Sequence, residues 1–235
     1  MGYVMRTLQA GLGIIFVLCL PILLLTSGIR VAVNEIRLYE YGFDKYEISL
    51  LRPVDRAELA EIARELIVYF NSEDELIGDR LRQVFPTRRE IIHLWEVKRL
   101  IQLSYRVQEI ALVYTFAYLA LGFACLRKAF LPKLAKAVLG GSVTTIVLPL
   151  ILGGLALFAF NWFWWKFHVI SFPGSDYWIL DPEKHNLLRM FPQGFWFDAT
   201  MLVTGGVAVA ALMMGGGAGA YLVVRQRRDR PIEGQ

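Results

Sequence analysis

The stretch "AVLGGSVTTIVLPLILGGLALFAF", Ala137–Phe160, is an apolar run without a charged side chain. A helix needs roughly 20 such residues to cross the hydrocarbon core of a bilayer. Three further runs, at residues 8–28, 110–126 and 199–224, are mainly apolar and come close to this length. The sequence therefore predicts a mainly α, polytopic membrane protein with four transmembrane helices.

The first of these runs, residues 8–28, allows two interpretations. Arg6 precedes it and the small residues Thr26, Ser27 and Gly28 end it, a pattern that also fits a cleaved signal peptide. The apolar core is long for a signal peptide, which favours a membrane anchor.

Basic residues beside the apolar runs predict the orientation of the chain. The link at residues 127–136, "RKAFLPKLAK", has no acidic side chain, and the tail at residues 225–235 begins "RQRRDR". Cytoplasmic loops are enriched in lysine and arginine, so both segments are expected in the cytoplasm. Residues 29–109 and 161–198 then face outward. The net charge of +4 is therefore explained by membrane orientation, and nucleic-acid binding is not needed to account for it.

The outer segment 29–109 mixes acidic with basic residues, as a folded polar domain would. After Asp55, a good helix cap, apolar residues recur with helical spacing at Leu59, Ile62, Ala63, Leu66 and Ile67. Further on, "TRRE" at Thr87–Glu90 has the capping-box pattern, and neither glycine nor proline follows before Gly122. The outer domain is therefore expected to be mostly helical, with His93 on a helix.

This helix poses a geometrical problem. If it ran straight into the second span, His93 would lie about 25 Å above Ile110, too far from the bilayer interface. Either the helix bends or the bilayer starts higher, where Gln102, Arg106 and Glu109 form a polar stripe that could face the bundle interior. Because this stripe lies opposite His93 on an unbroken helix, we expect a bend or break between His93 and Ile110.

The third and fourth spans carry helix-breaking or small residues. Pro149 with Gly153 and Gly154 predicts a bend in the third span. In the fourth, Gly215 with Gly219 predicts a small-residue face for close helix packing.

His93 and Glu96 stand three residues apart and so share a helix face. The carboxylate can hold one ring nitrogen as a donor and leave the other free as a base, which is half of a proton-transfer site. For an isolated pair of this kind, a surface histidine with an incidental acid is the simpler interpretation.

The second outer segment makes a catalytic interpretation of the histidines more plausible than a surface one. Here "NWFWWKFHVISFPGSDYW", at residues 161–178, surrounds His168 with aromatic residues. Aromatic belts mark the level where lipid head groups meet acyl chains. Such a belt is itself routine, and it accounts for Trp162, Trp164, Trp165 and Trp196. A base at this depth, however, could reach the ester linkages of a lipid.

Other chemistries lack their motifs. There is no H-E-x-x-H, no C-x-x-C and no third suitably spaced histidine for zinc, no G-x-S-x-G for a serine hydrolase and no P-loop. An internal repeat typical of many transporters is also missing. Acid–base chemistry without a protein nucleophile, a metal or a cofactor remains.

Three blocks give the chain a resemblance to the bacterial lipoprotein intramolecular transacylase family. They are HLWEVK at His93–Lys98, FHVISFPGSDYW at Phe167–Trp178 and NLLRMFPQGFWFD at Asn186–Asp198. The plan of four spans and two outer segments is similar too, so the resemblance covers most of the chain. This sequence departs from the family where Glu96 replaces an aspartate, and where Pro173–Ser175 lacks an asparagine often found there.

The resemblance implies an enzyme that moves the sn-2 acyl chain of a lipoprotein's diacylglyceryl-modified N-terminal cysteine onto the α-amine, giving the lyso-form. It implies that His93 and His168 are catalytic, with Glu96 as the partner of His93. Lys98 and Trp178 lie inside the matched blocks and are candidate substrate-binding residues.

The resemblance also implies a bacterial cell-membrane protein whose active site faces the extracytoplasmic side. Lipoproteins and membrane lipids are the expected partners, and a monomer the expected state. His185 falls outside the catalytic assignment and is interpreted as a loop histidine.

The expected mechanism uses His93, braced by Glu96, to take a proton from the amine, while His168 protonates the departing alkoxide; the two roles could be exchanged. No covalent intermediate is needed, because both reacting groups belong to one substrate. Two other functions stay open from the sequence: a non-enzymatic membrane scaffold or assembly factor, and a lipid hydrolase that uses water.

Overall fold

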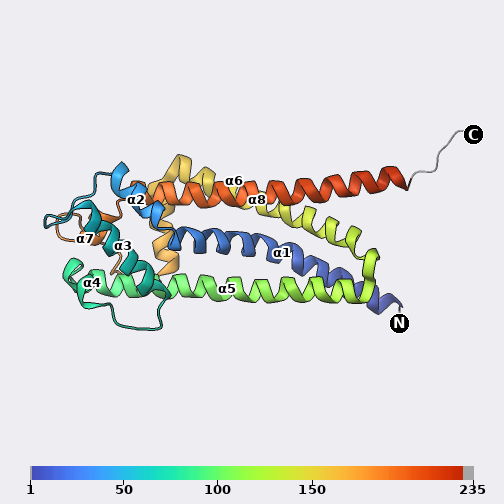
Figure 1. Ribbon diagram of the computed structural model, residues 1–235, viewed down its shortest axis with the longest axis horizontal. Helices are drawn as coiled ribbons and strands as arrows, with labels where there is room; N and C mark the ends of the chain where they lie inside the picture. The colour runs from blue at the N-terminus through green and yellow to red at the C-terminus, as the bar shows by residue number, and fades with distance from the viewer. Residues whose placement is uncertain (1, 230–235) are drawn as a thin grey trace, which may run out of the picture. The chain divides into compact units, whose positions relative to one another are not determined.

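We describe residues 2–229 of a computed structural model of the chain, and side chains from Gln9 onward. Its elements, in order, are α1 (Gly2–Asn34), α2 (Ile36–Lys45), α3 (Arg56–Asn71), α4 (Asp79–Val84), α5 (Arg88–Leu126), η1 (Arg127–Ala129), α6 (Leu131–Ser171), α7 (Asn186–Met190) and α8 (Gln193–Arg228) (Figure 1).

Four of these helices are long and apolar enough to cross a membrane, at Gln9–Asn34, Arg88–Ala129, Leu131–Ser171 and Gln193–Arg228. The protein is therefore a mainly α membrane protein with four spanning helices, as the sequence predicts. The last six residues of the predicted cytoplasmic tail, Arg230–Gln235, lie outside the described part.

The chain divides into two units, which we describe separately. Unit 1 comprises the described residues of Met1–Gly28, Val107–Leu152 and Thr204–Gln235. Unit 2 comprises Ile29–Arg106 and Gly153–Val203.

In unit 1, α1 packs along α5 through aromatic and polar contacts. The Tyr114 hydroxyl donates a hydrogen bond to the Leu12 carbonyl at 2.6 Å, and Phe16 stacks on Tyr118 with ring centroids 4.8 Å apart. Both contacts involve residues of 8–28, the run predicted to be a membrane anchor.

Small residues let the other helices of unit 1 approach closely. A Cβ added at Gly215 of α8 would lie 2.9 Å from the Ser142 Cβ of α6, and one at Gly141 would lie 2.8 Å from Leu20 Cδ2 of α1. The predicted packing face is therefore confirmed at Gly215. At Gly219 the prediction is wrong, because a Cβ there would meet nothing within 4 Å.

Unit 2 has its own apolar core, built from α2, α3, α4, α7 and the adjoining turns of the long helices. Its fully buried side chains include Ile62, Leu66, Leu81, Phe85 and Met190. The predicted stripe of α3 faces this core, with Ile67 at its edge. Asp55 caps α3 as predicted, because its carboxylate accepts the Glu58 backbone N–H at 2.7 Å.

The helix α5 runs without interruption from Arg88 to Leu126, so the bend or break expected between His93 and Ile110 is wrong. The expectation rested on the height of His93 above Ile110 and on the polar stripe lying opposite His93. Instead the upper part of α5 belongs to unit 2, where Gln102 donates to the Ser72 carbonyl at 2.9 Å.

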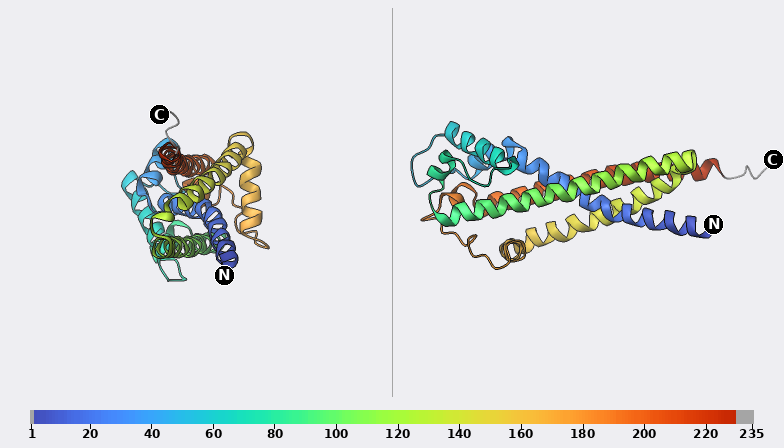
Figure 2. Two further views of the ribbon diagram at one scale, coloured as in Figure 1. Left: turned by 90° about the vertical axis from the view of Figure 1, so that its right-hand side faces the viewer. Right: turned by 90° about the horizontal axis from the view of Figure 1, so that it is seen from below.

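The helix α6 is kinked, at a position the sequence did not indicate. Its non-helical backbone is at Ala159 (φ −148°, ψ 44°), beyond the predicted bend at Pro149, Gly153 and Gly154, and α6 changes direction there (Figure 2). Immediately after the kink, Phe160 meets Phe197 of α8 edge to face, with ring centroids 5.4 Å apart.

Candidate functional site

The structure brings His93 of α5 and His168 of α6 together in unit 2. Their ring centroids lie 5.8 Å apart with an interplanar angle of 32°. Both residues are nearly inaccessible, at 7% and 6% exposure. Histidine blocks far apart in the sequence thus form one buried pair.

The first turn of α5 is fixed by the predicted capping box. Glu90, which is fully buried, accepts hydrogen bonds from the Thr87 backbone N–H at 3.1 Å and the Thr87 hydroxyl at 2.8 Å. Its other carboxylate oxygen accepts the Leu187 N–H at 2.9 Å, which joins α5 to α7. The helix start that carries His93 is therefore held from both sides.

His93 faces the carboxylate that the sequence assigned to it. Its Nδ1 lies 3.6 Å from Glu96 Oε2, longer than a hydrogen bond, and both atoms are buried without a hydrogen-bond partner. A proton on Nδ1 points to Glu96 and leaves Nε2 as the basic atom.

His168 is oriented by its own helix. Its Nδ1 lies 2.8 Å from the Trp164 carbonyl oxygen. A carbonyl oxygen can only accept, so Nδ1 carries the hydrogen and the lone pair of the neutral ring is on Nε2. Both imidazoles of the pair can therefore present Nε2 as a base.

Aromatic rings enclose the pair. Phe172 contacts both imidazoles, edge to face on His93 at 5.2 Å and tilted on His168 at 5.7 Å. Trp164 and Phe167 pack edge to face against His168, with centroids 4.6 Å and 5.4 Å away. Such surroundings exclude water and strengthen electrostatic interactions within them.

The two candidate substrate-binding residues lie in different surroundings. Trp178 belongs to the enclosure, with its ring 5.0 Å from His168 and its Nε1–H donated to the Ser175 carbonyl at 3.0 Å. Lys98 lies about 140° around α5 from His93. Its Nζ donates to Ser72 Oγ at 3.0 Å and lies 4.2 Å from the centre of the Tyr69 ring, so its contacts are with α3 and the loop after it.

His185 has a structural setting. It precedes α7, is buried, and accepts the Asp181 backbone N–H at Nδ1 over 2.9 Å. The Glu183 backbone N–H, with Lys184 beside it, keeps the pKa of the Asp181 carboxyl below its ordinary value. His185 therefore belongs to an ordered turn, in agreement with its interpretation as a loop histidine.

One ion pair near the site was not predicted. Arg89 Nη2 donates to Asp176 Oδ2 at 2.8 Å, and Arg89 Nη1 donates to the Asp176 carbonyl at 2.6 Å. Both residues lie in or beside the sequence blocks singled out above. Their pairing depends on tertiary structure, which neither block reveals alone.

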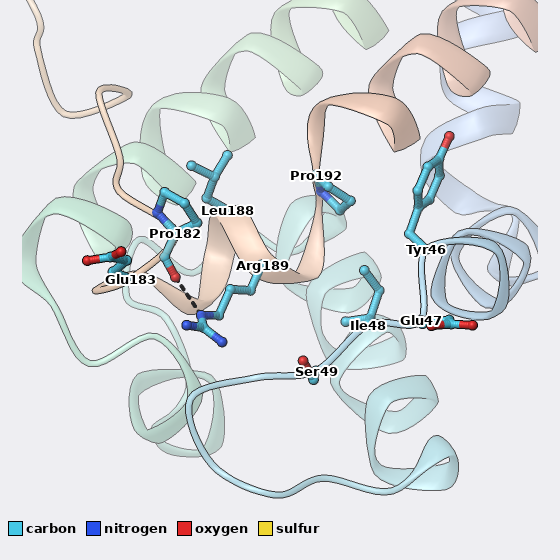
Figure 3. A pocket seen from close by; sticks show the side chains of 9 residues that line it. All are labelled: Tyr46, Glu47, Ile48, Ser49, Pro182, Glu183, Leu188, Arg189 and Pro192. Atoms are coloured by element: carbon cyan, nitrogen blue, oxygen red, sulfur yellow. Dashed lines mark hydrogen bonds between the residues drawn. The ribbon is translucent and has the colours of Figure 1, made fainter.

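A separate shallow hollow of about 330 Å³ lies elsewhere in unit 2 (Figure 3). It is lined by Tyr46, Glu47, Ile48, Ser49, Pro182, Glu183, Leu188, Arg189 and Pro192. Arg189 Nε donates to the Pro182 carbonyl at its edge. Neither imidazole lines this hollow, and within residues 2–229 no three His, Cys, Asp or Glu side chains are grouped to hold a metal ion.

Comparisons with known proteins agree with this architecture. The family model described as lipoprotein intramolecular transacylase Lit matches residues 14–196. The solved structure of the membrane-integral lipoprotein intramolecular transacylase Lit from Bacillus cereus has the same fold, with a TM-score of 0.81 at 20% identity, covering 95% of this chain and 100% of that chain.

Two variants of the Bacillus cereus protein, in which one histidine is replaced, are also similar. The arginine variant gives a TM-score of 0.77 at 20% identity, covering 97% of each chain. The alanine variant gives 0.75 at 21% identity, covering 97% of this chain and 99% of that one. No curated protein matches in a sequence comparison.

Proposed function

The chain belongs to the lipoprotein intramolecular transacylase family, and from this premise we propose that it moves the sn-2 acyl chain of a diacylglyceryl-modified N-terminal cysteine to the α-amine of that cysteine. The chain is a multi-pass membrane acyltransferase. The observation that carries the proposal is the pair of buried imidazoles, 5.8 Å apart inside an aromatic enclosure.

The proton balance of this reaction explains why two bases are useful. An α-amine has a reference pKa of about 7.7–8.0, so at neutral pH it is mostly an ammonium and cannot attack an ester. It must lose one proton before attack and a second as the amide forms. Only one of these protons is consumed, by the departing sn-2 alkoxide.

The surroundings of the two rings differ, and we use this difference to assign one of the two amine protons to each ring. His93 has the Glu96 carboxylate 3.6 Å from Nδ1, whereas no carboxylate is paired with His168 among the contacts described above. We assign His93 the first proton, taken from the ammonium through Nε2 and released to water when the product leaves.

His168 has a backbone carbonyl at Nδ1, which fixes the tautomer of the neutral ring. We assign it the second proton, which it takes from the amine nitrogen after attack and passes to the alkoxide oxygen. The new C–N bond forms and the ester C–O bond breaks in this sequence, and no acyl group is attached to the protein. Because like charges repel, the pair works best when one ring is charged at a time.

The amine and the ester belong to the same molecule, so the protein has mainly to hold them together. Well-oriented intramolecular reactions reach effective molarities on the order of 10⁵–10⁸ M. The rings around the pair, Trp178 among them, would position the glyceryl group. We place this site on the extracytoplasmic side, because the segment 127–136 is basic and without acids.

A labelled substrate tests the proposal. Purified protein in lipid is given a synthetic diacylglyceryl lipopeptide whose sn-2 chain alone is deuterated, mixed with an unlabelled lipopeptide of different peptide mass. We expect mass spectrometry to find the deuterated chain on the amine of its own peptide. An unlabelled chain on the labelled peptide, or a deuterated chain on the other peptide, would contradict the assignment. No turnover would favour the scaffold.

A further inference from the structure

The loop after α6 closes over the imidazole pair. We call residues 172–178 the cover loop; its first residue, Phe172, contacts both rings and its last, Trp178, contacts His168. The loop is shaped from within by two hydrogen bonds, Ser175 N–H to the Phe172 carbonyl at 3.2 Å and Trp178 Nε1–H to the Ser175 carbonyl at 3.0 Å.

The cover loop is tied to α5 by Arg89. Two hydrogen bonds, to the side chain and to the carbonyl of Asp176, join them at 2.8 Å and 2.6 Å. The guanidinium also lies 5.8 Å from the centre of the Tyr177 ring. Because Arg89 precedes His93 by one turn of α5, this strap links the loop over His168 to the helix that carries His93.

The loop has to move for the site to work. At 7% and 6% exposure, the two imidazoles are sealed from an ester that arrives from outside. The strap is itself accessible, with side chains 40% exposed for Arg89 and 65% for Asp176. Exposed ion pairs contribute little to stability, so this one can open and close without disturbing the core of unit 2.

A closed site matters for the choice of nucleophile. If water reaches the ester, its oxygen bonds to the acyl carbonyl carbon and the C–O bond to the sn-2 oxygen breaks. The fatty acid is released and the sn-2 oxygen takes a proton, so the cysteine amine is left without an acyl chain. Closed sites suppress hydrolysis of this kind by excluding water.

We propose that the Arg89–Asp176 strap holds the cover loop closed during the reaction and so sets the ratio of acyl transfer to hydrolysis. Arg89 is then a positioning residue, which acts through the loop and not on the reacting atoms. This inference rests on the function proposed above, and it adds a determinant of product choice to the same site.

The test is a product ratio measured in ¹⁸O-labelled water with purified full-length protein and a diacylglyceryl lipopeptide. Arg89→Ala and Asp176→Ala should each raise the share of free fatty acid by up to about fivefold, the ratio that an exposed ion pair can sustain. Fatty acid released by hydrolysis carries one ¹⁸O atom, which distinguishes it from contaminating lipid. The exchanged pair, Arg89→Asp with Asp176→Arg, should return the ratio towards that of the unmodified protein.

Arg80→Ala provides a matched control. Arg80 pairs with Glu61 at 2.5 Å with similar exposure, 40% and 54%, but joins α4 to α3 away from the cover loop. An unchanged ratio in both strap variants, or an equal rise in Arg80→Ala, would overturn the inference and leave the transacylase assignment intact. If the unmodified protein itself releases only ¹⁸O-labelled fatty acid, the proposed function fails instead.

Discussion

The two helix segments that carry the imidazoles are built differently. The start of α5 is straight, capped by Thr87 and Glu90, and sets a carboxylate beside its histidine without a closed hydrogen bond. The end of α6 follows a kink, is rich in aromatic residues, and orients its histidine through the backbone carbonyl of Trp164.

This difference teaches that the two histidines are not equivalent copies of one base. His93 has a carboxylate beside Nδ1, whereas the Nδ1 of His168 is bound to a backbone carbonyl that fixes its tautomer. A symmetric pair would share both protons equally. An asymmetric pair can divide them, one ring to activate the amine and one to relay a proton to the leaving oxygen.

The largest effects are expected from removing either ring. His93→Gln and His168→Gln should each lower the rate of N-acylation at neutral pH by about 10²–10⁴-fold, the usual contribution of a general acid or base. The double variant should be slower than either single one, because each ring handles a different proton of the reaction. His185→Gln, measured in the same lipopeptide assay, should remain close to the unmodified protein.

Substitution of Glu96 tests whether this carboxylate acts through His93 and not through His168. Glu96→Gln should slow the reaction by up to roughly 10–100-fold, the value of a hydrogen bond to a charged group, which His93 and Glu96 can form only when the 3.6 Å gap between them closes during the reaction. The effect should vanish in a His93→Gln background and persist in a His168→Gln background. A loss of equal size in both backgrounds would mean that Glu96 supports the site as a whole.

Substitution of Trp178 tests the aromatic surroundings of His168. Trp178→Ala should reduce the rate about three- to tenfold, in line with the 0.5–1.5 kcal/mol of an aromatic contact, and Trp178→Phe should keep most of it. The measurement is the steady-state rate divided by the amount of folded protein. A loss as deep as that of His168→Gln would instead make Trp178 part of the proton transfer.

The smallest effect on catalysis is expected at Lys98, on the other face of α5. Lys98→Met should lose about 1–3 kcal/mol of stability with the bonds to Ser72 and Asp74, while the rate per folded molecule stays nearly constant. Thermal unfolding alongside the rate separates the two quantities. A specific rise in KM without a loss of stability would support the substrate-binding interpretation.

Local patterns predicted local structure well. The Asp55 cap, the capping box before His93 and the apolar stripe of α3 depend on residues within one or two turns, and all three are confirmed. The four spanning helices follow in the same way from runs of apolar residues.

Tertiary features were beyond these patterns. The break expected in α5 is absent. Gln102 donates a hydrogen bond to the end of α3, and helical spacing within α5 cannot predict a contact with another helix. The non-helical residue of α6 is Ala159, ten residues after Pro149, and the next residue, Phe160, packs on Phe197 of α8, a contact that the sequence of α6 alone does not reveal. The strap between Arg89 and Asp176 likewise joins residues that only the fold brings together.

The pH dependence of the two histidine variants tests the division of labour most directly. Above about pH 8 the amine is largely deprotonated without help, so the need for the first acceptor disappears. We predict that the rate deficit of His93→Gln shrinks as the pH rises through this value, while that of His168→Gln stays constant. Parallel profiles, or a recovery confined to His168→Gln, would contradict the account.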